Sequence, residues 1–447
     1  MTKKRELELC QPLNPADYFT LAMDDEIRRE AMPGSLCGFA VELDKWPEIN
    51  ELVSRIDEFV ARFPLALASL QQQGKQFYWV QRPNPRPVFY RHFCPEGEEE
   101  HIFQHATVQR LINLREVRES TAPIEFHLIL GRQKSCFLLR WLHPFCDARG
   151  AELIFSYLSS HDKAARDRFD TPETEALVNG QLRKYKWWQK IHLFYKAYRY
   201  IHQLDCYSSI LHGQSDQLPQ QLNFQVQRFD EKQTQIIAQQ ARTLCGLTGT
   251  SLYYLGCLMR ALQQLEPAAI GEAYCVPYAF NLRKQKAVSP VLGNHVGPLF
   301  AQATRPLLEN RELLFSHLTQ QNKHVIRQQL DYAFLPVMQA ASWLSLKKQG
   351  QELRQSYKNS KERSSFWFSD IGQLNFAPNS FFGADISGLF HLSQLSSPPG
   401  LALLCCHYRK QLTLTYNFIE PLFSAEQIAR LHGYMTRELL GYDALQK

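Results

Sequence analysis

The chain has 447 residues, enough for about two to four domains of ordinary size, and it is too long for a small binding module. Apolar residues make up 45% and charged residues 21%, and the 21 Gly and 23 Pro are too few for a fibrous or low-complexity protein. Fifty Lys and Arg against 44 Asp and Glu give a net charge of +6, which is too small an excess for a dedicated nucleic-acid-binding protein.

The cysteines and the N-terminal residues bear on compartment and metal binding. The 11 cysteines are scattered, without a CxxC pair or a zinc-ligand spacing, so the sequence predicts no metal site and a reducing cytoplasm. Residues 1–5 are followed by Glu6 and Glu8 instead of an apolar run, so we expect no signal peptide. The chain also lacks a run of about 18 uncharged apolar residues, so we expect no membrane-spanning helix.

The first part of the chain reads as helices alternating with strands. The apolar spacing in residues 48–63 predicts a helix that ends at a proline, and residues 77–80 read as a short strand. Residues 124–130 and 135–142 read as two strands joined by a turn. A helix follows, with apolar residues 153, 154, 157 and 158 on one face.

The composition changes after residue 161. Residues 162–181 are polar, whereas residues 183–203 are aromatic and basic, with six Lys and Arg and no acidic residue before Asp205. One helical stripe in this segment consists of Trp187, Ile191, Phe194, Tyr198 and Ile201. The segment is either an interfacial helix for lipid or an acidic partner, or a linker helix that packs its aromatic face on the domain. Such stripes usually belong to a core, so the second reading is favoured.

The second part repeats the alternation after a loop at residues 208–221. An amphipathic segment spans residues 229–244, and a helix spans residues 248–265 with Thr248 or Thr250 as its N-cap. The remaining predicted elements are a strand at 273–280, long helical material at 311–346, strands at 366–368, 401–408 and 411–418, and a helix at 424–440 capped by Ser424 and Glu426.

The strongest candidate for chemistry lies at residues 141–150. His143 ends a predicted strand, and Asp147 stands at the start of a helix. A neutral imidazole can accept a proton from a hydroxyl, amine or thiol if its ring is held in place. The HxxxD spacing alone is weak evidence, and a core histidine is the plain alternative. A second HxxxD, from His212 to Asp216, lies in a polar loop and is read as coincidence.

Several segments in order along the chain match motifs of one enzyme superfamily. They are Pro12-Leu13-Asn14-Pro15-Ala16-Asp17, His143 to Asp147, Gly246-Leu247-Thr248 with the helix up to Leu262, Val276 to Arg283, Leu292-Gly293-Asn294-His295-Val296, and Ser369-Asp370-Ile371-Gly372-Gln373. Together they resemble the acyltransferases that include chloramphenicol acetyltransferase, the condensation domains of nonribosomal peptide synthetases, wax ester synthases and mycobacterial polyketide-associated acyltransferases. The resemblance covers nearly the whole chain.

The resemblance implies an α/β fold with two chloramphenicol-acetyltransferase-like sandwich halves that form a pseudo-dimer around a tunnel. It implies that His143 is the general base and that Asp147 is structural, paired with Arg283. The residues expected to bind substrate or support the site are Arg283, Ser369, Asp370, Gly372 and Asn294, with Gly372 permitting a close backbone passage. No permanently bound cofactor is expected, because an acyl-CoA or a phosphopantetheine-linked acyl group serves as co-substrate.

The motifs also depart from the usual pattern. Leu142 replaces the first His of HHxxxDG, Asp147 is followed by Ala-Arg-Gly, and Asp370 replaces Asn. Arg149 is therefore a second candidate partner for Asp147, which would leave Arg283 for an anionic group. Cys146, beside this motif, is expected to be a small apolar filler.

These observations predict three regions: an N-terminal half at 1–165, a crossover at 166–222, and a C-terminal half at 223–447. The predicted function is an acyltransferase of lipid or secondary-metabolite synthesis that moves an acyl group from a coenzyme A or carrier-protein thioester to a hydroxyl or amine. The alternative is a non-catalytic condensation-like domain that binds an acyl carrier, a lipid or a protein partner. We expect a cytoplasmic protein that does not bind nucleic acid. Acyl carrier protein is a candidate partner, and residues 183–203 are a candidate contact with the inner face of the membrane.

Overall fold

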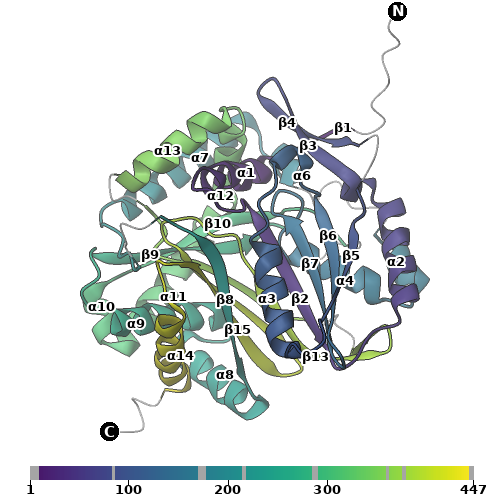
Figure 1. Cartoon of the computed structure of the whole chain (residues 1–447). Coiled ribbons are helices and arrows are strands. Elements are labelled where there is room, and N and C mark those ends of the chain that lie inside the picture. The colour runs from purple at the N-terminus through teal and green to yellow at the C-terminus, as the bar shows by residue number, and fades with distance from the viewer. Residues whose placement is uncertain are drawn as a thin grey trace, which may run out of the picture.

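The computed structural model describes residues 10–82, 86–169, 178–213, 218–283, 290–358, 362–374 and 379–441. Two six-stranded sheets dominate this part of the chain, and a three-stranded sheet lies at the edge of the first half. The large sheets occupy different halves of the molecule, and helices cover each of them (Figure 1). The prediction of an α/β fold with two similar halves is therefore confirmed.

The first large sheet carries the strand that leads to His143. In spatial order its strands are β12 (Ser380–Phe381), β13 (Ala384–Leu392), β2 (Leu36–Leu43), β7 (Ser135–Leu142), β6 (Ile124–Leu130) and β5 (Phe89–Phe93). Helices α2 (Ile49–Arg62) and α4 (Ala148–Ser159) cover one face. Leu52, Ile56 and Phe59 recur at helical spacing on α2 and are buried, which supplies the apolar stripe that holds α2 on the sheet.

The second large sheet has its own helical layer. In spatial order its strands are β10 (Val296–Thr304), β9 (Ala273–Asn281), β11 (Trp367–Gln373), β14 (Leu401–Tyr408), β15 (Gln411–Glu420) and β8 (Gln221–Phe229). Its helices include α8 (Glu231–Cys245), α9 (Thr250–Leu265), α11 (Arg311–Arg327) and α14 (Ala425–Leu440). Helix α9 is buried on nearly every side, so its apolar sequence continues the core of this half.

The two halves share a strand and a core. Strand β13 follows β11 in the chain, yet it pairs with β2 of the first sheet, from Ile386 opposite Leu43 to Leu392 opposite Gly38. One apolar cluster also runs from helix α3 (Glu100–Ile112) to the second sheet, where the rings of His105 and Phe224 stack. The loop that carries His143 follows β7, which is a strand of the same sheet that receives β13.

The remaining described elements are short strands, short helices and four longer helices. They are β1 (Cys10–Pro12), α1 (Pro15–Arg29), η1 (Pro64–Leu67), β3 (Ala68–Gln73), β4 (Gln76–Gln81), η2 (Arg118–Ser120), α5 (Lys163–Asp167), α6 (Val178–Arg183), α7 (Trp187–Leu204), α10 (Arg305–Glu309), α12 (Leu330–Ala341) and α13 (Leu346–Lys358). None of the described helices is both long and apolar enough to cross a membrane.

Several predicted helix ends need correction. The N-cap of α9 is Gly249, and no side chain caps this helix, so the prediction of Thr248 or Thr250 is wrong. The capping box of α14 joins Ser424 to Gln427 instead of Glu426, because the third helical position is the one that reaches back to the cap. The material predicted at 311–346 is divided into α11 and α12 at Gln329, whose φ of 55° lies in the left-handed region.

Helix α7 does not pack as predicted. Its buried residues are Leu193, Ala197, Tyr200 and Leu204, which contact α12 and β10. The predicted stripe lies mostly on the opposite face, with Trp187 71%, Ile191 60% and Tyr198 59% exposed. The favoured reading, in which the aromatic stripe packs on the domain, is therefore wrong, because the four buried residues on the other face make that contact.

Candidate functional site

The loop from β7 to α4 is held by hydrogen bonds from its own residues. The backbone N–H of His143 donates to the Ser35 carbonyl at 2.9 Å, and that of Phe145 donates to the Leu142 carbonyl at 2.8 Å. The indole N–H of Trp141 donates to the Cys146 carbonyl at 2.8 Å. These bonds fix the path of the loop, so the positions of His143 and Asp147 follow from the ends of a buried strand and a helix.

Asp147 is the centre of an ion pair between the two halves. Its carboxylate caps α4 by accepting from the Gly150 N–H at 2.8 Å, and it accepts from the His295 N–H at 2.8 Å. The Arg283 guanidinium donates to both carboxylate oxygens, at 2.7 and 2.9 Å. Burial alone would raise the pKa of Asp147, but Arg283 and His295 hold that pKa below its ordinary value. Four hydrogen bonds therefore keep Asp147 ionised and fixed.

Arg283 also donates hydrogen bonds to backbone carbonyls of its own half. Its Nε donates to the Val291 carbonyl at 2.8 Å, and its Nη2 donates to the Gly293 carbonyl at 2.7 Å. Arg149, the other candidate partner of Asp147, instead forms an ion pair with the buried Glu152. The alternative that released Arg283 for an anionic group is therefore wrong, because Arg283 makes the bidentate pair itself.

A cavity of about 410 Å³ separates the two halves beside His143. Residues of both large sheets line it, and they include Trp141, His143, Asn281, Ser369, Asp370 and His391. The His143 ring is half-buried, and its Nδ1 has no well-formed hydrogen bond with any described residue. Burial lowers the pKa of His143, although its own carbonyl and Asp147 oppose that shift. The imidazole is therefore neutral at physiological pH, which is the state in which it accepts a proton.

The second half contributes polar groups to this cavity from β11. Asp370 accepts from the Ser251 hydroxyl at 2.6 Å and from the Gly372 N–H at 3.0 Å. Burial raises the pKa of Asp370, against the effect of Ser251. Ser369, the residue before it on β11, also lines the cavity. Three of the residues predicted to bind substrate or support the site, Arg283, Ser369 and Asp370, thus share a cavity with His143.

Gly372 has a different role from the predicted one. A Cβ added at this position would meet no atom within 4 Å, so Gly372 does not permit a close backbone passage. Its φ of 80° instead requires glycine, and the register of β11 against β14 shifts between Asp370 and Gly372. This irregularity brings the Gly372 N–H to the Asp370 carboxylate.

His391 is a titratable residue of this cavity that the sequence did not reveal. It lies on the exchanged strand β13 and is 1% exposed, and its ring stacks on Phe39 with centroids 4.4 Å apart. Both ring nitrogens are buried without a hydrogen-bond partner among the described residues. Burial lowers the pKa of His391 to about 3. A single His in an apolar run carries no recognisable motif, so only the strand exchange identifies it.

The buried imidazole of His391 should make the unfolding free energy depend on pH. Because the pKa is depressed in the folded state, protonation below pH 6.5 favours the unfolded chain, and this contribution vanishes above that pH. Replacing His391 with phenylalanine removes the proton-binding group. Between pH 7.5 and pH 5, the variant should gain about 2 kcal/mol in unfolding free energy relative to wild type, as measured by urea unfolding.

The matched control is His101→Phe, because His101 is 79% exposed. This substitution should leave the pH dependence of unfolding as in wild type. The prediction would be wrong if the difference in unfolding free energy between wild type and His391→Phe were the same at both pH values. The His391 ring would then bind a proton equally well in the folded and the unfolded chain.

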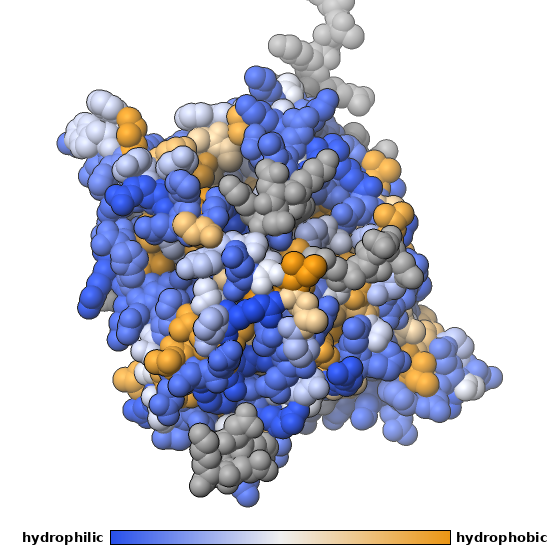
Figure 2. Space-filling view, turned by 90° about the vertical axis from the view of Figure 1, so that its left-hand side faces the viewer, coloured by the Kyte–Doolittle hydropathy of each residue, from blue (hydrophilic) through white to orange (hydrophobic). Residues whose placement is uncertain are grey.

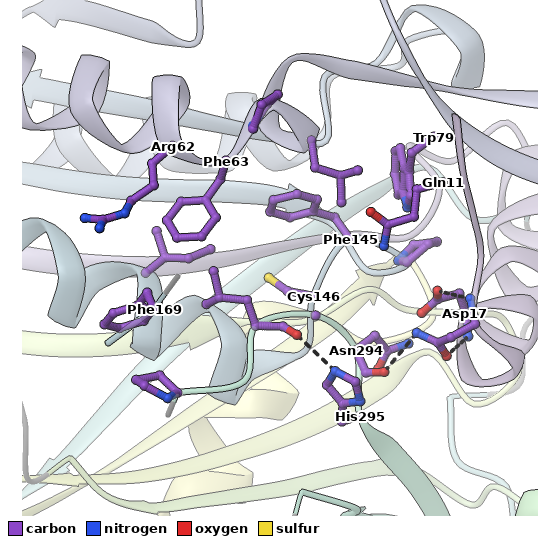
Figure 3. Close-up of a pocket in the computed structure, with 18 of the residues that line it drawn as sticks. Gln11, Asp17, Arg62, Phe63, Trp79, Phe145, Cys146, Phe169, Asn294 and His295 are labelled. Carbon is purple, nitrogen blue, oxygen red and sulfur yellow. Dashed lines mark hydrogen bonds between the residues drawn. The ribbon is translucent and has the colours of Figure 1, made fainter. Parts of the chain in front are cut away.

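A second cavity of about 440 Å³ lies on the other side of the same loop, and Asn294 lines it instead of the His143 cavity (Figure 3). Phe145 and Cys146 line this second cavity, whereas His143 and Asp147 line the first. Asn294 is buried, and its carbonyl accepts from the Asn14 amide at 3.4 Å. Asn294 therefore lies apart from the His143 cavity, and its expected role in binding substrate or supporting the site stays a prediction.

Polar or charged side chains line both ends of the second cavity. Asp17, Asn294 and His295 lie at one end, while Phe63 and Arg62 lie at the other (Figure 3). Burial raises the pKa of Asp17 well above its ordinary value and lowers that of His295 to about 4. Cys146 is buried, as expected for an apolar filler, and burial raises the pKa of its thiol.

Gly150 allows α4 to approach the loop that carries Gly293. A Cβ at Gly150 would lie 2.7 Å from the Cys146 Cβ and 3.1 Å from the Gly293 carbonyl oxygen. Gly150→Ala should therefore lower the unfolding free energy by about 1–3 kcal/mol. Gly433→Ala on α14 is the control, because a Cβ there meets nothing within 4 Å and should raise stability by about 0.5–1 kcal/mol. Equal effects of both substitutions on urea unfolding would contradict the close approach.

The first residue of the other HxxxD match forms contacts inside the second half of the protein. His212 is buried, and its ring nitrogens lie 3.1 Å from the Glu266 carboxylate and 2.7 Å from the Tyr274 hydroxyl. Asp216 lies outside the described residues. The described residues also contain no cluster of His, Cys, Asp and Glu that could hold a metal ion.

Comparisons with known proteins place this geometry in a known fold. No protein-family model and no curated protein sequence matches the chain. The first condensation domain of the CDA synthetase matches with a TM-score of 0.72 and 11% identity, over 97% of this chain and 96% of that one. Trichothecene 15-O-acetyltransferase from Fusarium sporotrichioides matches with a TM-score of 0.69 and 12% identity, over 97% and 94% of the two chains.

A third solved structure extends this range of similar folds. Polyketide synthase associated protein 5 from Mycobacterium tuberculosis matches with a TM-score of 0.61 and 13% identity, over 97% of this chain and 98% of that one. Each of these matches spans nearly the whole of both chains. The chain therefore has the two-half fold shared by chloramphenicol-acetyltransferase-like acyltransferases and condensation domains, as its ordered motifs predicted.

Proposed function

We propose that the protein is an acyltransferase that moves an acyl group from a thioester to a hydroxyl or amine, with His143 as the general base. The observation that carries this proposal is the position of His143, whose half-buried ring borders a cavity formed by both halves. A base inside such a cavity can meet an acceptor and a thioester that enter from different sides. The fold is shared with a trichothecene acetyltransferase and with condensation domains, which is consistent with this chemistry.

The proposed reaction is direct transfer. His143 takes the proton from the acceptor hydroxyl or amine while that atom attacks the thioester carbonyl, and the thiolate leaves as the carbon–sulfur bond breaks. The proton then passes from the imidazolium to the leaving thiolate, which restores His143 and releases a thiol. No acyl-enzyme intermediate forms, and no resident cofactor takes part.

Asp147 and Arg283 serve this reaction as positioning residues. Their bidentate pair joins the loop that carries His143 to the segment around Gly293. Because all four donors to Asp147 come from Arg283 and the backbone, Asp147 holds the loop and does not relay protons. Ser369 and Asp370 are the proposed substrate contacts on the opposite wall.

Donor and compartment are further parts of the proposal. The donor is an acyl-CoA or an acyl group on the phosphopantetheine arm of a carrier protein, and the net charge of +6 suits either anionic partner. A reducing cytoplasm is the proposed compartment, in line with the scattered spacing of the cysteines in the sequence. The division into regions 1–165, 166–222 and 223–447 stays a prediction.

The test is a thermal-shift series with acyl-CoAs and acyl-pantetheines of graded chain length, followed by mass spectrometry of transfer to pooled alcohols and amines. A donor at 100 times its dissociation constant adds about 2.7 kcal/mol of stability, which gives a clear shift. Absence of both binding and transfer across the series would contradict the proposal. Binding without transfer, unchanged in His143→Ala, would favour the non-catalytic condensation-like alternative.

A further inference from the structure

Helix α7 carries a second apolar face that the described fold leaves open to solvent. Six large side chains form it, and their exposed fractions are Trp187 71%, Trp188 50%, Ile191 60%, Phe194 42%, Tyr195 57% and Tyr198 59%. At 3.6 residues per turn they fall within an arc of roughly 120°, on the side of the helix away from its buried residues. Exposed large hydrophobic residues elsewhere in the described chain are more scattered.

Basic side chains border this aromatic face. Lys190 lies at one edge of it and Arg199 at the other, and the sequence has no acidic residue from 183 to 204. The Lys186 ammonium lies 4.9 Å from the centre of the Trp188 ring, and the Arg199 guanidinium lies 6.0 Å from the centre of the Tyr195 ring. Apolar aromatic side chains flanked by Lys and Arg are typical of helices that lie in the interface of an anionic bilayer.

The opposite face fixes α7 firmly to the protein. Leu193, Ala197 and Leu204 pack against α12, and the Tyr200 hydroxyl donates to the Phe300 carbonyl at 2.7 Å. The Lys196 ammonium also donates to the Gln328 carbonyl at 3.3 Å. The aromatic face is therefore presented on an ordered helix, so that ordering it does not add to the cost of binding.

The turn after α12 adds another aromatic side chain near the start of α7. The Lys190 ammonium lies 3.5 Å from the Gln339 side-chain oxygen, which brings the two helices together at this end. Trp343 follows Gln339 by one turn and is 68% exposed. Figure 1 shows α7 beside α12 and α13 at the surface of the molecule. Figure 2, which views the molecule from that side, shows hydrophobic residues in separate small groups on a mostly hydrophilic surface.

We propose that α7 docks the protein on an anionic lipid bilayer. The helix lies parallel to the membrane, with Trp187, Ile191 and Phe194 at the level of the headgroups and acyl-chain ends, and with Lys190 and Arg199 on lipid phosphates. A second copy of this chain fits the face less well, because two such faces would bring like charges together. This inference is independent of the proposed chemistry at His143.

The test is co-sedimentation with phosphatidylcholine vesicles that contain or lack phosphatidylglycerol. Wild type should bind the anionic vesicles at least about tenfold more tightly than the neutral ones, and added salt should weaken binding. The combined substitutions Trp187→Ser, Ile191→Ser and Phe194→Ser should lower binding at least about tenfold. The control Leu247→Ser with Ile270→Ser, whose side chains are 77% and 76% exposed elsewhere, should bind as wild type does.

Two further measurements distinguish binding of lipid to the aromatic face of α7 from binding of a second copy of the chain. Lys190→Glu with Arg199→Glu should reduce binding to anionic vesicles while circular dichroism shows an unchanged fold. Light scattering after gel filtration should give the same mass for wild type and the triple variant. Failure of wild type to bind anionic vesicles, or equal binding by the triple variant, would overturn the proposal. A wild-type dimer that the triple variant converts to a monomer would assign the face to a second copy and would overturn it as well.

Discussion

Replacing His143 with alanine should lower the rate of acyl transfer by about 100- to 10,000-fold, which is the usual contribution of a general base. The His143 ring borders the cavity between the halves, and its loop is held by backbone bonds to Ser35 and Leu142 that alanine preserves. The variant should therefore bind the thioester and unfold as wild type does. Release of free thiol and mass spectrometry of the product measure the loss.

The pH profile adds an independent readout of the same residue. The pKa of His143 lies below its ordinary value because of burial, so the ring is neutral at pH 7 and becomes protonated only at lower pH. The value of kcat/KM should stay level from pH 8 to pH 7 and fall on the acidic side as the base is protonated. His101→Ala, at an exposed position, should leave both rate and profile unchanged. Equal product from wild type and His143→Ala would contradict the assigned role.

Replacing Arg283 with methionine should lower the unfolding free energy by about 3–5 kcal/mol, because it leaves the Asp147 carboxylate buried without its partner. The Arg283 side chain is 8% exposed and that of Asp147 is 3% exposed, so water cannot compensate. The double variant Asp147→Asn with Arg283→Met should recover part of the loss, since no unpaired charge remains. Urea unfolding of the four proteins in this cycle measures the coupling.

The sign of the pH dependence should also reverse in the Arg283 variant. In wild type the pKa of Asp147 is depressed, so its contribution to stability is present above the unfolded pKa and is lost as pH falls through the folded pKa. Without Arg283, burial is the largest remaining influence and raises that pKa, so the carboxyl contributes stability that is lost as pH rises. The deficit of Arg283→Met should therefore be larger at pH 8 than at pH 5. A small deficit that is equal at both pH values would show that Asp147 does not depend on Arg283.

Local patterns in the sequence predicted the elements that build the candidate site. The strands before His143 and the helix after Asp147 were visible because alternation and helical spacing are local. The pairing of Asp147 with Arg283, which are 136 residues apart, followed only from a resemblance of ordered motifs. The spacing of residues along the chain does not reveal which distant side chains meet. The structure gives the distances between them.

Other features depend on how elements meet, and the sequence did not predict them. His391 enters the cavity because β13 crosses to the sheet of the other half, and a strand's sequence does not state which sheet it joins. Helix α7 has apolar residues on two faces, so periodicity could not decide which of them is covered. Asn294 and His143 lie in different cavities because the loop between β7 and α4 separates them.

The most direct test of the account is a crystal structure of the protein with a thioether analogue of an acyl-CoA, which cannot be cleaved by transfer. We predict that the thioether sulfur lies beside the His143 ring, in the cavity lined by Ser369 and Asp370. The Asp147–Arg283 pair should keep its two hydrogen bonds in this complex. A ligand bound with its sulfur away from His143, in the cavity of Asp17 and Asn294 or on the outer surface, would contradict the central claim that transfer from a thioester takes place beside His143.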